Sequence, residues 1–175
     1  WRSMNPMSPG LNRVEADELT YGLHILIRTD LEIALLEDGL DVTDLPHEWN
    51  QKYKDLLGIL PSNDSEGCLQ DVHWSEGAFG YFPSYLLGHL ISAQLSEAMS
   101  SFLHDEGIKG EDPIGTCIYN GNEDKLLFWL RKEVHQHGRK LNAEQLVQNV
   151  TGKELSSSPF LNYLEQKISI LTSTS

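Results

Sequence analysis

Basic residues are scarce in this 175-residue sequence. Lysine and arginine number 13 against 26 aspartates and glutamates, which gives a formal net charge of −13. Nucleic-acid binders and polybasic membrane-surface modules need a cationic face, so the composition argues against both. Long apolar runs are missing as well, because glycine, histidine or charge interrupts each one well before the ~18 residues of a membrane-spanning helix. We expect no nucleic-acid partner and no membrane partner.

Cysteine is nearly absent, and metal-binding motifs are missing. Cys68 and Cys117 lie far apart without a CxxC pair, which leaves a disulfide open but gives no reason to expect an oxidising compartment. The seven histidines include no HExxH and no HxxxH spacing. A catalytic zinc normally takes three protein ligands. The sequence therefore predicts no metal ligands within this chain.

No signal peptide is visible at the N-terminus, where Trp1 leads into prolines and a glycine and not into an apolar segment. We expect a cytoplasmic location, or an organellar one if an upstream targeting segment has been lost. The sequence begins with Trp and not with Met, so we expect a segment of a longer polypeptide. Its 39% hydrophobic and 22% charged residues are typical of a globular domain.

Apolar residues recur every three or four positions over most of the chain, which predicts an all-α helical bundle. Helices are expected over residues 13–37, 43–58, 83–102, 123–137, 142–150 and 158–171. Residues 107–122 are rich in glycine and are expected to be irregular. Residues 59–80 predict a long ordered loop, whose apolar residues Leu69, Val72, Trp74 and Phe79 favour burial. Loops of this length are usually functional.

Five polar residues share one face of the first predicted helix, at intervals of three or four: Arg13, Asp17, Tyr21, His24 and Arg28. In one interpretation Asp17 holds an arginine in place to bind an anionic group. In the other, this is a solvated face with ordinary side-chain pairs. The spacing leaves both open.

A second group of polar residues lies between residues 67 and 85, among glycines and aromatic residues. Asp71 can orient an imidazole, while His73 and Tyr81 can donate to a developing oxyanion. The alternative is a loop whose polar side chains satisfy its own buried backbone. Residue types alone favour neither.

Several blocks, in order along the chain, resemble the Taq-type zinc carboxypeptidases, also called the thermostable carboxypeptidase 1 family. The matching blocks are residues 13–21, 45–53, 67–74, 80–88, 129–131 and 135–138. The Gln-Asp-x-His-Trp and Gly-Tyr-Phe-Pro sequences within them are highly specific. The chain departs from the family pattern at Asn12, where the family has Ile, and at His89, where it usually has Asn.

The resemblance implies part of a larger, cleft-containing metallopeptidase fold similar to neurolysin and angiotensin-converting enzyme. Residues 1–175 would be the C-terminal helical segment, with the upstream zinc-binding part absent. The full-length parent would bind zinc, release single amino acids from peptide C-termini and form a homodimer. Without an HExxH helix, this chain alone is expected to be inactive.

The resemblance also implies roles for particular residues. His73 and Tyr81 would be catalytic, because they match positions that stabilise the tetrahedral intermediate. Substrate binding would fall to Arg13, Gln70, Asp71 and Tyr85. Of these, Arg13 lies in the family's Ile-Arg-x-x-Ala-Asp motif and would bind the substrate's terminal carboxylate, ideally in a bidentate manner. Gln70 and Asp71 would orient the substrate and the imidazole.

Two other functions stay open. The chain could be a stand-alone helical binding or interaction module that kept the fold and lost catalysis. Alternatively, a separate chain could supply the zinc helix by assembly. An HExxH sequence in the reading frame upstream of Trp1 would favour the carboxypeptidase segment over both.

Overall fold

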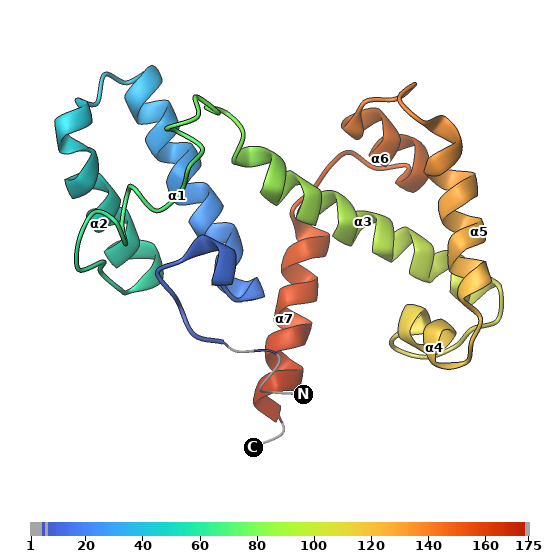
Figure 1. Ribbon diagram of the computed structural model, residues 1–175. Coiled ribbons are helices and arrows are strands. Elements are labelled where there is room, and N and C mark those ends of the chain that lie inside the picture. The colour runs from blue at the N-terminus through green and yellow to red at the C-terminus, as the bar shows by residue number, and fades with distance from the viewer. Residues whose placement is uncertain (1–4, 6, 174–175) are drawn as a thin grey trace. The chain divides into compact units, whose positions relative to one another are not determined.

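The computed structural model describes residues 5 and 7–173. Over that range the chain consists of helices and loops with no strand, which confirms the predicted all-α class (Figure 1). The chain divides into two compact units, Trp1–Leu87 and Gly88–Ser175. No helix in the described part is long and apolar enough to span a membrane.

The α-helices are α1 (Glu18–Leu36), α2 (Leu45–Leu57), α3 (Pro83–Asp105), α4 (Pro113–Tyr119), α5 (Glu123–Glu133), α6 (Ala143–Thr151) and α7 (Ser158–Ser173). Short 3-10 helices are η2 (Arg13–Glu15), η3 (Val42–Asp44) and η4 (His135–His137). All six predicted helices are present. The first was predicted to begin too early, because Asp17 has an extended backbone and separates η2 from α1. The fourth was predicted too long, since α5 ends at Glu133 and η4 follows it.

In the first unit, α1 packs against α2 (Figure 1). Ile27 and Leu31 of α1 are fully buried in one core with Trp49 and Tyr53 of α2. The rings of Trp49 and Tyr53 stack with their centroids 5.0 Å apart. Gly58 ends α2 with a φ of +71°, a left-handed conformation that favours glycine. This helix pair is the support for the loop that follows it.

Residues 59–82 contain turns and bends but no helix, as the glycine and proline pattern predicted. Trp74 packs against the core of the first unit. The predicted burial of Leu69 and Val72 is wrong, since they are 70% and 60% exposed, and Phe79 is 43% exposed. The loop is therefore anchored at some of its aromatic residues and presents its aliphatic ones outward.

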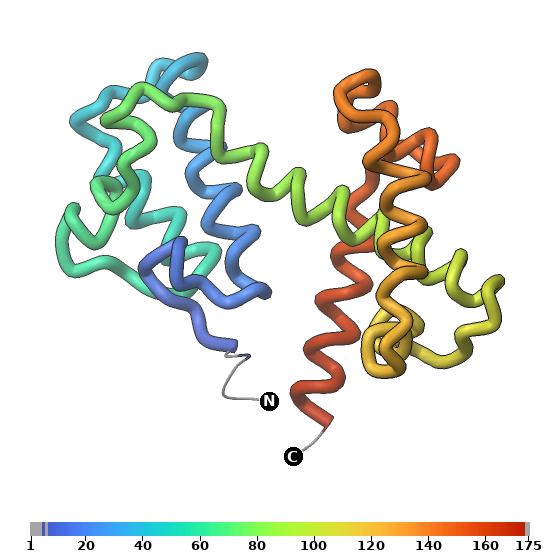
Figure 2. The backbone as a smooth tube through the Cα atoms, turned by 45° about the vertical axis from the view of Figure 1, so that its right-hand side comes forward, coloured from blue at the N-terminus to red at the C-terminus, as the bar shows by residue number. Residues whose placement is uncertain are grey.

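The second unit has a core built on Met99, Leu103, Cys117 and Trp129. The prediction of an irregular segment over 107–122 is wrong, because α4 lies within it, between α3 and α5 (Figure 2). The Asp112 side chain accepts a hydrogen bond from the backbone N–H of Gly115 at 2.8 Å and caps this helix. Cys68 and Cys117 are both buried free thiols, so the disulfide left open does not form.

Candidate functional site

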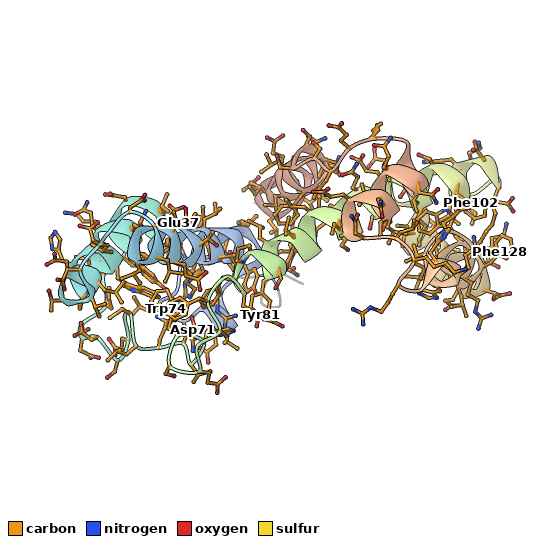
Figure 3. All side chains as sticks on the ribbon, turned by 90° about the horizontal axis from the view of Figure 1, so that it is seen from above. Glu37, Asp71, Trp74, Tyr81, Phe102 and Phe128 are labelled. Atoms are coloured by element: carbon orange, nitrogen blue, oxygen red, sulfur yellow. The ribbon has the colours of Figure 1, made fainter. Side chains whose placement is uncertain are left out.

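Asp71 lies at the centre of a cluster of polar side chains in the first unit (Figure 3). Its Oδ1 accepts a hydrogen bond from Arg13 Nη2 at 2.6 Å, and its Oδ2 accepts one from Arg28 Nε at 2.5 Å. Arg13 Nε also lies 3.1 Å from Oδ1. The side chains of Arg13, Arg28 and Asp71 are only 9%, 1% and 12% exposed. One nearly buried carboxylate thus holds two guanidinium groups.

Aromatic rings flank both guanidinium groups. The Cζ atom of Arg13 lies 5.2 Å from the ring centroid of Tyr85 and 5.6 Å from that of Phe82. The Cζ atom of Arg28 lies 4.7 Å from Trp49 and 5.6 Å from Phe82. Contacts between cations and aromatic rings are stronger where water is excluded. The rings therefore add to the attraction that holds both arginines beside Asp71.

Gln70 ties the arginines to the surrounding backbone. Its Oε1 accepts hydrogen bonds from Arg28 Nη2 at 3.0 Å and from the backbone N–H of Arg13 at 3.2 Å. Its Nε2 donates to the carbonyl oxygens of Leu11 at 3.0 Å and Glu66 at 2.8 Å. These four contacts fix the amide and hold the segment that carries Arg13 against the loop.

His24 and Tyr53 form the buried back of the cluster. The Tyr53 hydroxyl donates to the Leu11 carbonyl oxygen at 3.1 Å and lies 3.1 Å from His24 Nδ1. Since the tyrosine proton goes to Leu11, Nδ1 carries the imidazole proton and donates to the hydroxyl oxygen. Burial, reinforced by the charge of Arg28, lowers the pKa of His24 to about 4. Burial raises the pKa of Tyr53. Both side chains are therefore neutral at neutral pH.

The ion cluster itself stays charged. Burial by itself would raise the pKa of Asp71, but hydrogen bonds from Arg13 and the charge of Arg28 outweigh it and hold that pKa below its usual value. Burial by itself would lower the pKa of Arg13, but the hydrogen bond to Asp71 and the charge of Asp71 raise it by more. The pKa of Arg13 therefore lies above its ordinary value. Each charge thus stabilises the other against the cost of burial.

His73 lies between Asp71 and two tyrosines. Its Nε2 is 3.1 Å from the Tyr85 hydroxyl. Its Nδ1 is 3.7 Å from Asp71 Oδ1, too far for a hydrogen bond, and has no hydrogen-bond partner among the described residues. The ring centroid of Tyr81 lies 5.8 Å from that of His73. Tyr81 is 52% exposed, whereas the His73 side chain is 14% exposed, so the tyrosine forms the outer part of the pair.

The six residues predicted for the site lie in one connected cluster: Arg13, Gln70, Asp71, His73, Tyr81 and Tyr85. They come from η2, the loop over residues 59–82 and the start of α3. Figure 3 shows two of them, Asp71 and Tyr81, on the same side of α1 as Trp74. Segments 58 residues apart in the sequence thus meet at one place.

Both interpretations of the polar helix face need correction. Asp17 accepts hydrogen bonds from the backbone N–H groups of Leu19 and Thr20, each at 2.9 Å, and so caps α1. The guanidinium of Arg13 is held by Asp71 instead. The face is not solvated either, because His24 and Arg28 are fully buried. The first error arises because η2 and α1 are separate helices, and the second because α2 and the loop pack over this face of α1.

Sequence reasoning missed three members of the cluster and its surroundings. Trp49 and Tyr53 were assigned only to the core, although their rings contact Arg28 and His24. Glu32 was not considered, although it is buried and accepts hydrogen bonds from the loop. Its spacing of four residues from Arg28, on the same face of α1 as His24, was the available signal.

Asn12, the departure from the family pattern, has a local role. Its side chain accepts a hydrogen bond from the backbone N–H of Val14 at 2.9 Å and caps η2. Ile could not make this contact. The substitution therefore preserves the turn that carries Arg13.

A metal ion does not fit the residues of this cluster. In the described part of the chain, no three His, Cys, Asp or Glu side chains are grouped so that they could hold one. The carboxylate nearest to His73 belongs to Asp71, and both of its oxygens already accept hydrogen bonds from arginines. Asp71 is therefore not available as a ligand for a metal ion.

The chain is similar in sequence and structure to several carboxypeptidases. The chain is 43% identical over 170 residues to Carboxypeptidase 1 of Bacillus subtilis, and the match covers 97% of this chain and 32% of that protein. It is 42% identical to Thermostable carboxypeptidase 1 of Thermus thermophilus, with the same coverage of both. The crystal structure of the M32 carboxypeptidase from Deinococcus radiodurans R1 has a TM-score of 0.88 at 35% identity, covering 97% of this chain and 33% of that one.

The chain therefore spans about a third of the length of these relatives. The model of the family described as Carboxypeptidase Taq (M32) metallopeptidase matches residues 1–168. The family predicted from the Gln-Asp-x-His-Trp and Gly-Tyr-Phe-Pro sequences is confirmed: the chain belongs to the Carboxypeptidase Taq (M32) metallopeptidases.

Proposed function

We propose that this chain is the C-terminal helical segment of a metallocarboxypeptidase that releases single amino acids from peptide C-termini. Arg13 binds the terminal carboxylate of the peptide, and His73 and Tyr81 stabilise the oxyanion of the tetrahedral intermediate. Family membership supports the class of reaction. The observation that carries the residue roles is the pairing of two arginines with the single carboxylate of Asp71.

The charges of this pairing favour an anionic ligand. Arg13, Arg28 and Asp71 bring together two positive charges and one negative charge in nearly buried surroundings. A buried charge without a counter-ion is costly, so an anion that docks here is stabilised. A peptide carboxylate has the charge and the two-oxygen geometry that a guanidinium recognises. Arg13 is more exposed than Arg28, so Arg13 is the residue that meets it.

The polar groups beside the arginines support the second role. If the peptide carboxylate binds Arg13, the last amide bond of the peptide lies a few ångströms from it. This distance is similar to those from Asp71 to His73 and from His73 to Tyr81. His73 Nδ1 has no hydrogen-bond partner in the described part of the chain, and Tyr81 is half exposed. Tyr81 is therefore open to donate to an oxygen that becomes negatively charged, and His73 Nδ1 is a buried nitrogen beside it without a partner among the described residues. Gln70 and Asp71 were expected to orient the substrate and the imidazole, but Asp71 makes no hydrogen bond to His73. Both residues instead orient the substrate-binding arginine, and Tyr85 packs on its guanidinium.

The family implies a metal ion, and we assign it as zinc held by residues outside this chain. The described residues do not provide a group of ligands for it. The isolated chain is accordingly expected to be inactive. The homodimeric assembly stays a prediction of the resemblance, and the cytoplasmic or organellar location stays a prediction from the sequence.

The role of Arg13 is tested in a full-length carboxypeptidase that contains this chain. Arg13→Ala removes a charge-assisted contact worth ~1.5–3 kcal/mol, so kcat/KM for peptides with a free C-terminus should fall roughly 10–150-fold. Peptides with an amidated C-terminus should be poor substrates of both forms. The matched control is Arg139→Ala, which removes an exposed arginine of the second unit and should leave kcat/KM unchanged. A loss within about twofold for Arg13→Ala contradicts the role.

The role of Tyr81 gives a different kinetic signature. Tyr81→Phe removes an oxyanion donor, so kcat should fall on the order of 10²–10³-fold with little change in KM. Tyr119→Phe, at a tyrosine that is 91% exposed on α4, is the matched control. A wild-type full-length protein without any carboxypeptidase activity would contradict the function and favour the non-catalytic interaction module.

A further inference from the structure

Glu32 is a buried carboxylate on α1 that binds both flanks of the candidate oxyanion site. It is 4% exposed. Its Oε1 accepts a hydrogen bond from the indole Nε1–H of Trp74 at 2.9 Å. Its Oε2 accepts one from the backbone N–H of Gly80 at 3.0 Å. Each carboxylate oxygen of Glu32 thus binds a different residue of the loop, Trp74 or Gly80.

These two points are the immediate neighbours of His73 and Tyr81 in the sequence. Between them the loop has turn hydrogen bonds, such as the one from the N–H of Ala78 to the His73 carbonyl oxygen at 2.8 Å, and one from the Ser75 hydroxyl to the Val72 carbonyl oxygen. Gly80 has a φ of +74°, a left-handed conformation that a side chain would strain. The backbone there is therefore adapted to present its N–H to Glu32. The carboxylate fixes where the loop segment begins and where it ends.

A purely structural role would not need a carboxylate at this position. Leu31, the preceding residue on the helix, is fully buried in the apolar core. A buried charge is costly unless it is fully hydrogen-bonded, and both recorded donors to Glu32 are neutral groups. What the carboxylate adds over an apolar side chain is direction, because hydrogen bonds fix the angle and distance of each donor.

We propose that Glu32 is a positioning residue that sets the placement of His73 relative to Tyr81. The inference rests on the proposed function, in which these two residues share one oxyanion. Stabilisation of a developing charge depends on donors held at the correct place, and a displacement of about 1 Å can cost 10²-fold in rate. Glu32 acts through Trp74 and Gly80 and does not touch the substrate itself.

The first test is kinetic and uses Glu32→Gln in the full-length carboxypeptidase that contains this chain. The amide nitrogen of Gln cannot accept a hydrogen bond, so one of the two donors loses its partner. We expect kcat to fall roughly 10–100-fold with KM within about twofold, the signature of a defect confined to the transition state. The matched control is Glu37→Gln, the same substitution at an exposed residue next to the end of α1, which should change neither constant (Figure 3).

A second substitution makes the test specific to the hydrogen bond. In the Glu32→Gln background, Trp74→Phe removes one of the two donors, so the single amide oxygen can accept from the Gly80 N–H without competition. We expect this double variant to recover part of the lost kcat, which general destabilisation could not produce. If Glu32→Gln does not fold, Trp74→Phe alone should lower kcat several-fold at unchanged KM. An unchanged kcat for the folded variants, or a loss that appears in KM, overturns the inference.

The second test is independent of activity. In this chain, Glu32→Leu removes both acceptor oxygens, so amide hydrogen exchange of Gly80 should become about 10-fold faster or more. The ring resonances of His73 and Tyr81 should shift in the same spectra, while those of Trp129 in the second unit should not. If the full-length wild type shows no carboxypeptidase activity, the proposed function fails but this test still applies. Unchanged Gly80 exchange together with unchanged ring resonances overturns the positioning role.

Discussion

Replacing Asp71 with asparagine tests the ion cluster more directly than any other single change. Asn has nearly the same shape, but it carries no charge and its amide nitrogen cannot accept a hydrogen bond. At least one of Arg13 and Arg28 then loses its acceptor, and both guanidinium groups stay charged in nearly buried surroundings. The substitution isolates the contribution of the charge from that of packing.

The expected loss is large. A hydrogen bond to a charged group contributes about 1.5–3 kcal/mol, and breaking a buried ion pair costs about 3–5 kcal/mol. We expect the free energy of unfolding at neutral pH to fall by about 3–5 kcal/mol, a large share of the roughly 5–15 kcal/mol typical of a folded domain. Because the pKa of Asp71 is lower in the folded state, its stabilisation is present above the ordinary value of 3.8 and is lost as pH falls through the folded-state pKa. The difference between wild type and variant should shrink accordingly in acid.

Urea denaturation followed by tryptophan fluorescence measures this loss, since Trp49 and Trp74 both lie in the first unit. The matched control is Asp30→Asn. It breaks an exposed ion pair in which Lys52 Nζ lies 2.9 Å from Asp30 Oδ2, and it should cost less than about 1 kcal/mol. If Asp71→Asn destabilises the protein no more than Asp30→Asn does, the cluster does not contribute what its geometry implies.

Three further outcomes are expected. The pKa of His24 is about 4 in the folded state against an ordinary value of 6.5, so the unfolded state binds the proton at a higher pH than the folded state does. The free energy of unfolding should therefore decline by up to about 3 kcal/mol as pH falls from 6.5 to 4. Urea titrations across this range should show a flatter pH dependence for His24→Gln, and an equal slope would contradict this. Leu31→Ala should cost about 2–5 kcal/mol in the same assay because the side chain is fully buried. Leu36→Ala, at a leucine that is 63% exposed, should stay within about 0.5 kcal/mol, and similar losses for both would be inconsistent with the core described. Asn142→Ala removes a reciprocal cap of α6 and should cost about 1 kcal/mol by thermal unfolding, whereas an unchanged transition would show that the cap does not stabilise the helix.

Helices could be predicted where they bury a long apolar stripe. In α2, Trp49, Tyr53 and Leu57 follow at a spacing of four and are all buried, and Gly58 ends the helix as its sequence position indicated. In α4 only seven residues are helical, too few for periodicity to emerge, although Asp112 and Pro113 supplied a start signal. Hydrophobic periodicity alone therefore does not reveal short capped helices.

The sequence identified part of the cluster but neither all of its members nor the pairing of Arg13. The motifs identified Arg13 and the loop residues, and the structure brings them together. Spacing pointed to Asp17 as the partner of Arg13, because periodicity sees only neighbours on the same helix. The actual partner, Asp71, lies 58 residues away and becomes a neighbour only when the loop folds back over α1. Contacts of this kind depend on tertiary packing, which local patterns do not encode.

One face of α1 explains why the loop is held in one conformation. His24, Arg28 and Glu32 follow at intervals of four residues, so they lie about 6 Å apart along one side of the helix. Each holds a different point of its surroundings: the hydroxyl of Tyr53, the carboxylate of Asp71, and the flanks of the segment from Trp74 to Gly80. Apolar side chains at these three positions could bury as much area, but they would leave the orientation of an irregular loop open. Directional contacts from α1 fix that orientation, and substituting Arg28 or Glu32 should displace the loop while α1 keeps its own backbone hydrogen bonds.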